Sequence, residues 1–139
     1  MSRLLAYRRK INYVTSTLGD LPSNLDDKHQ FQALLYCLHT SIEALMDIVA
    51  MMVKDLGLEV GDDYSNIESL ESAKIIKKDV ADYLRKLNGL RNAIVHRYNK
   101  FDEKIVLEEL NEVLNHVSNF LEVVEGVLQK IFRTDKEGS

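Results

Sequence analysis

The stretch ALLYCLHTSIEALMDIVAMMV, residues 33–53, decides the fold class of this chain. Its apolar residues follow the helical period and no proline or glycine interrupts them, so it predicts one long helix. It also contains His39, Glu43 and Asp47, and ionisable side chains of this kind are rare inside membrane spans. The stretch therefore predicts a helix buried in a bundle, and not a membrane helix.

The same helical period dominates the sequence on both sides of this stretch. Including the helix that contains it, it predicts helices over residues 3–18, 26–56, 65–73, 77–97 and 102–132. Capping boxes at Ser23-x-x-Asp26 and Ser65-x-x-Glu68 are expected to open the second and third of them. Four long helices with short connections predict an all-α, up-and-down four-helix bundle, with the short helix over the crossover.

Length and composition set the limits of this prediction. The 139 residues suit one domain, which we expect over residues 1–133, followed by a frayed polar tail over 134–139. One cysteine, Cys37, excludes a disulfide within the chain, which fits a reducing compartment. The N-terminus has no long hydrophobic region of the kind found in signal peptides. We therefore expect a cytoplasmic protein.

The charge of the chain is unevenly distributed. The whole chain carries a net charge of −4, so its surface as a whole is not built to coat nucleic acid. Between Lys74 and Lys104, however, nine Lys or Arg stand against four Asp or Glu, a local balance of +5. Either a local site for a polyanion or a solvated helix face would produce this pattern.

This basic segment contains the pattern R-x4-H-x-Y, formed by Arg91, His96 and Tyr98. Arginine holds its charge at any physiological pH, and histidine exchanges a proton near pH 7. Together they suit chemistry on a phosphodiester. Residues five apart on a straight helix lie about 140° apart, so Arg91 and His96 do not pair tightly within one helix. Either the helix distorts, a second copy completes the site, or both cations merely cap the helix end.

A polar stripe runs through the apolar second helix at i, i+4 and i+8, formed by His39, Glu43 and Asp47. Three residues over successive turns span about 12 Å, which is too far for one metal ion. The stripe is better interpreted as a buried polar seam whose carboxylates orient Arg91 or another basic group. No metal site and no cofactor are predicted, since zinc spacings and phosphate-binding glycine loops are missing from the sequence.

At residues 91–98, RNAIVHRY, the chain resembles the HEPN superfamily, and within it the HepT-like toxins. The segment SIEALMDI, residues 41–48, resembles the acidic second-helix segment of the same proteins, and the order of helices is similar over nearly the whole chain. The resemblance implies a helical domain that forms a homodimer, with the two motifs facing a shared, positively lined cleft. It also implies a metal-independent endoribonuclease that is the toxin of a type II-like toxin–antitoxin system.

The resemblance implies roles for individual residues. Arg91 would bind or polarise the scissile phosphate of RNA, and His96 would serve as general base or acid for attack by the ribose 2′-hydroxyl. Asn92 would position the phosphate or the histidine. The expected partner is an MNT-type nucleotidyltransferase antitoxin that inactivates the toxin by adding AMP to Tyr98. Arg97, beside that tyrosine, would help to hold the added phosphate.

Three hypotheses remain open at the level of sequence. The first is the ribonuclease toxin, with Arg91 and His96 catalytic and with Asn92, Glu43, Asp47 and Arg97 in support. The second is a non-catalytic HEPN protein that binds a nucleotide or substrate beside a minimal nucleotidyltransferase. The third is a helical bundle without a site.

Overall fold

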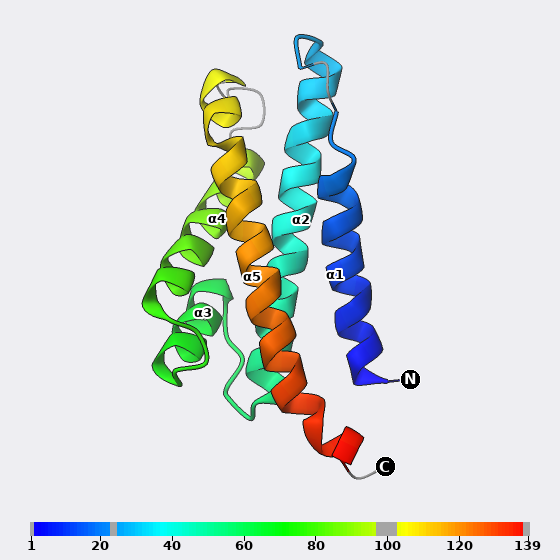
Figure 1. Cartoon of the computed structure of the whole chain (residues 1–139). Helices are drawn as coiled ribbons and strands as arrows, with labels where there is room; N and C mark the ends of the chain where they lie inside the picture. The colour runs from blue at the N-terminus through cyan, green and yellow to red at the C-terminus, as the bar shows by residue number, and fades with distance from the viewer. Residues whose placement is uncertain (1, 23–24, 97–102, 138–139) are drawn as a thin grey trace.

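The computed structural model describes residues 2–22, 25–96 and 103–137 of the chain. In chain order, these residues form helices α1 (Arg3–Gly19), α2 (Lys28–Asp55), α3 (Asp63–Ser72), α4 (Lys78–His96) and α5 (Glu103–Glu137). The four long helices run alternately up and down, and both termini lie at the lower end in Figure 1. α2 packs against α1, α3 and α4, and α5 packs against α1 and α4. The predicted all-α, up-and-down bundle is confirmed.

The short helix α3 lies between α2 and α4 and contacts both, as predicted. Its start was predicted wrongly, because the capping residue is Asp62 and not Ser65. The Asp62 carboxylate accepts hydrogen bonds from the Ser65 backbone N–H at 2.7 Å and from the Ser65 hydroxyl at 2.6 Å. An aspartate placed before the helix satisfies an N–H that has no partner in the first turn, so α3 begins two residues earlier.

The start of α2 also differs from the prediction. Asp27 caps the helix, and its carboxylate accepts a hydrogen bond from the His29 backbone N–H at 2.8 Å. The helix therefore begins at Lys28 and not at Asp26, and Ser23 lies outside the described residues. At the other end of the chain, α5 continues to Glu137, past Phe132. Residues 134–137, which the sequence placed in a polar tail, are thus part of that helix.

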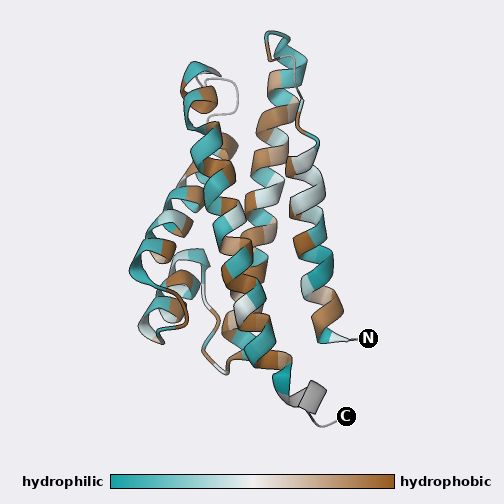
Figure 2. Ribbon diagram, viewed as in Figure 1, coloured by the Kyte–Doolittle hydropathy of each residue, from teal (hydrophilic) through white to brown (hydrophobic). Residues whose placement is uncertain are grey.

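The hydrophobic core is built around α2. Buried apolar side chains occur along α2 from Phe31 to Val53, and they form one cluster with buried apolar side chains of the other helices. The largest side chains with almost no exposed surface include Tyr7, Leu34, Leu45, Leu84 and Phe120. In Figure 2, hydrophobic and hydrophilic residues alternate around α4 and α5, as expected of helices with one buried face.

Among the described residues, α2 is the one helix with the length and hydropathy to cross a membrane. More than half of its most apolar window is buried inside the bundle. Core helices of soluble proteins share these properties, and here the apolar side chains already have partners in α1, α3 and α4.

A polar cluster joins the start of α1 to the end of α2. The buried Tyr7 hydroxyl donates a hydrogen bond to the Asp55 carboxylate at 2.7 Å, and Arg3 Nε donates to the same oxygen at 2.8 Å. Burial, and then the bond to Asp55, raise the pKa of Tyr7, so its hydroxyl stays protonated and remains a donor. The cluster thus ties the two ends together inside an otherwise apolar packing.

Candidate functional site

Arg91 lies on α4 and reaches across to α2. Its Nη2 donates a hydrogen bond to Glu43 Oε1 at 2.9 Å, and its Nη1 donates to Asn92 Oδ1 at 2.8 Å. The Arg91 side chain is 25% exposed, and its Nε is buried without a partner among the described residues. The packing of α2 against α4 therefore holds the guanidinium in one orientation, with Glu43 and Asn92 each contacting one terminal nitrogen.

The same oxygen of Glu43 also contacts His39, one turn earlier on α2. His39 Nε2 lies 3.2 Å from Glu43 Oε1. The hydrogen bond from Arg91, and then the charge of and bond to His39, lower the pKa of Glu43 against the opposing effect of burial. Glu43 is therefore a carboxylate at neutral pH and supplies the charge that fixes Arg91.

The predicted polar seam is confirmed in one part and wrong in another. Glu43 contacts Arg91 and Asp47 contacts another basic group, Lys10 of α1, at 2.8 Å, as expected of the two carboxylates. The seam is not buried, because the Glu43 side chain is 44% exposed and Asp47 lies on the surface. α2 thus presents its two carboxylates to cations on opposite sides, α4 and α1.

His96 ends α4 and is exposed. Within the described part of the chain it makes no hydrogen bond or ion pair, with Arg91 or with any other residue. α4 remains a regular helix up to His96, so the distortion that would bring the two residues together is not observed. One chain therefore gathers Arg91, Asn92 and Glu43, and leaves His96 separate from them.

The remaining predicted site residues, Arg97 and Tyr98, lie outside the described residues. Among the residues that are described, no group of three or more His, Cys, Asp or Glu is placed to hold a metal ion.

Two arginines of the 74–104 segment form ion pairs with carboxylates of the same chain. Arg85 binds Glu71 at 2.7 Å and Asp82 at 3.1 Å, and Arg91 binds Glu43.

A groove of about 410 Å³ lies between α1 and α2, directly beside Glu43. It is lined by Arg9, Lys10, Tyr13, Thr40, Glu43, Ala44 and Asp47. None of the α1 residues that line this groove is among the site residues predicted from the sequence. The spacing of Arg9 and Tyr13, one helical turn apart, was the signal that could have identified them.

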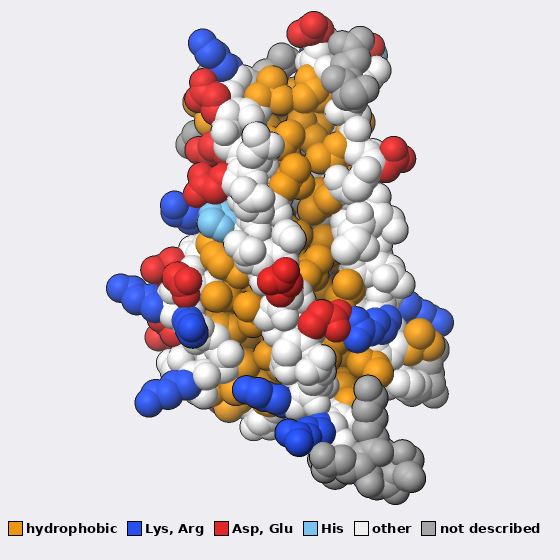
Figure 3. Space-filling view, viewed as in Figure 1, with side chains coloured by type: hydrophobic (Ala, Val, Ile, Leu, Met, Phe, Trp, Pro, Cys, Tyr) orange, Lys and Arg blue, Asp and Glu red, His pale blue; other side chains and the backbone are white. Residues whose placement is uncertain are grey.

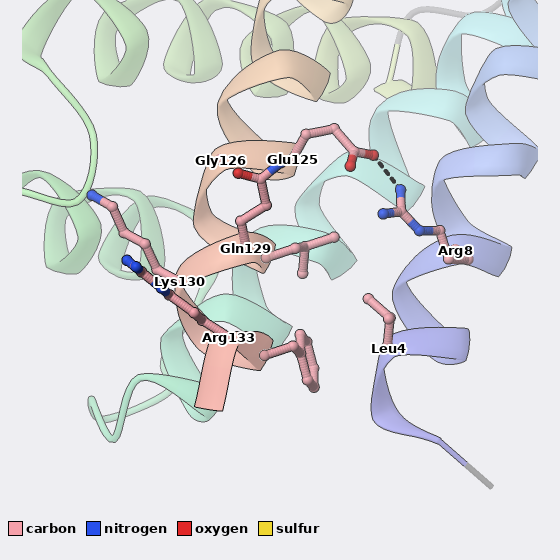
Figure 4. A pocket seen from close by; sticks show the side chains of 9 residues that line it. Leu4, Arg8, Glu125, Gly126, Gln129, Lys130 and Arg133 are labelled. Carbon is pink, nitrogen blue, oxygen red and sulfur yellow. Dashed lines mark hydrogen bonds and ion pairs between the residues drawn. The ribbon is translucent and has the colours of Figure 1, made fainter. Parts of the chain in front are cut away.

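A second hollow, of about 600 Å³, lies between α1 and the C-terminal half of α5 (Figure 4). An ion pair between Arg8 and Glu125 crosses it, and Leu4, Gln129, Lys130 and Arg133 are among the residues around it. None of the predicted site residues lines this hollow.

Comparison with known proteins places the chain in a family. Residues 6–124 match the family described as Ribonuclease HepT-like. The chain belongs to the HepT-like family. The match covers α2 and α4, and so it includes every side chain that the structure gathers around Arg91.

Two relatives of this HepT-like chain come from Archaeoglobus fulgidus, and both bear the name "Putative RNase". One is 46% identical over 125 residues, which cover 90% of this chain and 95% of the relative. The other is 39% identical over 123 residues, which cover 88% and 86%.

Solved structures share the fold of this HepT-like chain. A tri-AMPylated HEPN toxin of Shewanella oneidensis, in complex with an MNT antitoxin, matches with a TM-score of 0.71 and 22% identity. The match covers 91% of this chain and 99% of the toxin. A toxin–antitoxin structure with AMP-PNP matches with a TM-score of 0.68, 22% identity and coverage of 88% and 94%. The confirmed architecture is therefore that of HEPN toxins.

Proposed function

We propose that this chain is the toxin of a toxin–antitoxin pair and a metal-independent endoribonuclease that acts through Arg91 and His96. The observation that carries the proposal is the fixed guanidinium of Arg91, held by Glu43 at 2.9 Å and by Asn92 at 2.8 Å, inside an R-x4-H-x-Y pattern. Membership of a family described as ribonucleases, and two relatives named for RNase activity, support the same reaction.

In this mechanism Arg91 binds the scissile phosphate. Glu43 and Asn92 each accept one hydrogen from the terminal nitrogens, and each of these nitrogens carries a second hydrogen. The remaining donors suit the non-bridging oxygens of a phosphodiester, on which negative charge grows in the transition state. Because the guanidinium is already oriented, little ordering is required when RNA binds.

His96 supplies proton transfer. As a base it takes the proton of the ribose 2′-hydroxyl, whose oxygen attacks the phosphorus while the bond to the leaving 5′-oxygen breaks. The products are a 2′,3′-cyclic phosphate and a 5′-hydroxyl, which requires a second group to protonate the leaving oxygen. DNA has no 2′-hydroxyl, so the proposed substrate is RNA.

A homodimer would supply the second proton-transfer group and would complete the site. Exposed apolar side chains lie near the end of the bundle where α4 finishes: Val95 on α4, and Ile105 and Leu107 at the start of α5. On the face shown in Figure 3, a strip of hydrophobic side chains also extends to this end. Large exposed apolar side chains at one end of the bundle suit a protein interface. A two-fold axis there would bring two copies of His96 together.

We further propose that an MNT-type nucleotidyltransferase antitoxin inactivates the protein by adding AMP to Tyr98. The support is the fold shared with the Shewanella oneidensis toxin, which is AMPylated and bound to an MNT antitoxin. Mass spectrometry of the protein co-expressed with such an antitoxin tests this step. An AMP mapped to Tyr98 in the wild type and lost in Tyr98→Phe is expected, whereas AMP on another residue of the variant would contradict the assignment.

The deciding experiment is cleavage of labelled RNA by unmodified protein in EDTA, with Arg91→Ala and His96→Ala as comparisons. We expect the wild type alone to cleave, leaving a cyclic phosphate, and both variants to relieve the growth arrest caused by the wild type. If unmodified protein of confirmed mass leaves RNA intact, the ribonuclease proposal fails. A non-catalytic protein that binds a nucleotide beside a nucleotidyltransferase would then be the better account.

A further inference from the structure

The groove between α1 and α2 shares one side chain with the cluster formed by Arg91, Asn92 and Glu43. Glu43 lines the groove and also binds Arg91, so the groove begins where the proposed phosphate site ends. α2 lies between the two, with α4 on one side and α1 on the other. Because both adjoin Glu43, the groove is a neighbouring surface for an RNA strand that is held by one phosphate at Arg91.

The two cations that line the groove differ in whether a carboxylate pairs with them. Lys10 is neutralised by Asp47 at 2.8 Å, and Glu43 is neutralised by Arg91. Arg9 also lines the groove, and within the described residues it has neither an ion pair nor a hydrogen bond. The groove lining holds two cations and two carboxylates, and Arg9 is the cation among them without a partner in the described residues. An anionic group is the ligand that this arrangement favours.

An aromatic ring stands one helical turn from that cation. Tyr13 is 43% exposed and lines the same groove, and residues at i and i+4 share a helix face. A cation for a phosphate and an exposed ring for a base are the two elements of single-stranded nucleic-acid sites. The volume of about 410 Å³ is of the size of small-ligand pockets and accommodates one nucleotide.

We propose that this α1–α2 groove binds a nucleotide of the RNA strand next to the scissile phosphate. Tyr13 stacks on the base and Arg9 binds the phosphate of that nucleotide, while Lys10 stays paired with Asp47. The inference rests on the proposed ribonuclease function and adds to it a subsite that positions the strand. It assigns to α1 a role in substrate binding that is separate from the chemistry at Arg91 and His96.

The test measures binding apart from cleavage. Full-length protein carrying His96→Ala, which leaves RNA intact, is titrated against a fluorescein-labelled single-stranded RNA and followed by anisotropy. Adding Tyr13→Ala is expected to raise Kd about 10-fold, since stacking on an aromatic ring contributes strongly to binding each base. Tyr13→Phe keeps the ring and should bind like its parent. Arg9→Ala should weaken binding and lower the slope of log Kd against log salt by about 0.7.

Matched controls lie elsewhere on the surface. Tyr64→Ala removes a tyrosine of similar exposure, 46%, from α3, and Lys130→Ala removes an exposed cation from α5. Neither should change Kd by as much as 2-fold, because the proposed subsite includes neither residue. With His96 intact, Tyr13→Ala and Arg9→Ala should raise KM for RNA and largely keep kcat, as expected when a binding contact remote from the reaction is removed.

Each outcome decides the proposal. If the wild type cleaves RNA but Tyr13→Ala and Arg9→Ala bind like their parent, the subsite is refuted while the ribonuclease function stands. If Tyr13→Ala changes the oligomeric state in light scattering, the groove is an interface between copies and the subsite is refuted. If the wild type neither cleaves nor binds RNA, the ribonuclease function fails and the subsite fails with it.

Discussion

Single residues decide the chemistry of the candidate site, and Arg91 is the centre of it. Its contacts to Glu43 and to Asn92 use the planar fork of the guanidinium, which an ammonium group does not reproduce. Arg91→Lys should therefore fold normally but lower kcat for RNA cleavage by about 100-fold, the cost of losing one positioned charge stabiliser. Circular dichroism and single-turnover cleavage measure the two effects. A lysine variant with wild-type kcat would show that charge alone is sufficient.

Glu43 connects this site to stability at low pH. Its folded pKa lies below its ordinary value of 4.5, chiefly because Arg91 binds it. Its contribution to stability is therefore complete above that value, and it is lost as the pH falls through 4.5 toward the folded pKa. In Glu43→Gln this loss cannot occur, so stability should fall less steeply below pH 4.5. The effect is small, because the side chain is 44% exposed.

Urea unfolding of the wild type and of Glu43→Gln, between neutral pH and about pH 3, checks this expectation. Glu59→Gln, which changes an exposed carboxyl in the loop after α2, is the matched control and should keep the wild-type slope. Parallel curves for the wild type and Glu43→Gln would contradict a lowered pKa at Glu43.

At the scale of helices, α2 and α3 end in the same type of turn, with a glycine at its left-handed position after α2 and a lysine after α3. Leu58 N–H bonds to the Val53 carbonyl at 2.9 Å after α2, and Ile75 N–H bonds to the Leu70 carbonyl at 2.9 Å after α3. Both are Schellman turns, in which the residue after the cap adopts a positive φ. Gly57 has φ 77° and bears it without strain, whereas Lys74 adopts φ 61° with a side chain.

The left-handed backbone at Lys74 predicts a stabilising substitution. Lys74→Gly should raise the free energy of unfolding by about 1 kcal/mol, because it relieves a left-handed conformation that is costly for a residue with a Cβ. Gly57→Ala is the reciprocal control and should lower it by a similar amount. Chemical denaturation measures both. A destabilised Lys74→Gly would mean that the Lys74 side chain makes a contribution larger than the backbone strain.

The junction between α1 and α2 gives a prediction of the opposite sign. Tyr7 is fully buried, and its hydroxyl donates to the Asp55 carboxylate at 2.7 Å. Tyr7→Phe removes a hydrogen bond to a charged acceptor and should lower the free energy of unfolding by about 2 kcal/mol. Tyr13→Phe removes an exposed hydroxyl and should change it by less than about 0.5 kcal/mol. Equal effects in thermal melts would show that the Tyr7 bond adds nothing beyond burial of the ring.

At the scale of the whole molecule, one chain does not bring Arg91 and His96 into contact in its described part. If the proposed dimer builds each site from Arg91 of one copy and His96 of the other, two inactive variants should rescue each other. Mixed dimers of Arg91→Ala with His96→Ala would contain one intact site of two. Co-expression with two affinity tags isolates them. Because such a dimer keeps one of the two His96 side chains that share proton transfer, we expect activity well below half of the wild type but above that of either variant alone. Mixed dimers no more active than the two variants alone would contradict a site shared between copies in this way.

Much of the architecture follows from local patterns. Apolar residues at the helical period predicted the five helices and their order, because burying one face of a helix requires that spacing whatever it packs against. The helix starts were less predictable. The sequence predicted caps at Ser23 and Ser65, whereas Asp27 and Asp62 cap the helices. Several side chains before a helix can cap it, and packing selects the start.

The sequence by itself determined the helical bundle, the family resemblance and the R-x4-H-x-Y pattern, because these depend on residue order along one chain. Only the tertiary structure decided that Glu43 holds Arg91 while Asp47 turns to Lys10. The two carboxylates lie four residues apart on one stripe, so spacing alone does not distinguish them. The position of α4 on one side of α2 and α1 on the other does, and the same packing forms the groove of Arg9 and Tyr13 beside the site.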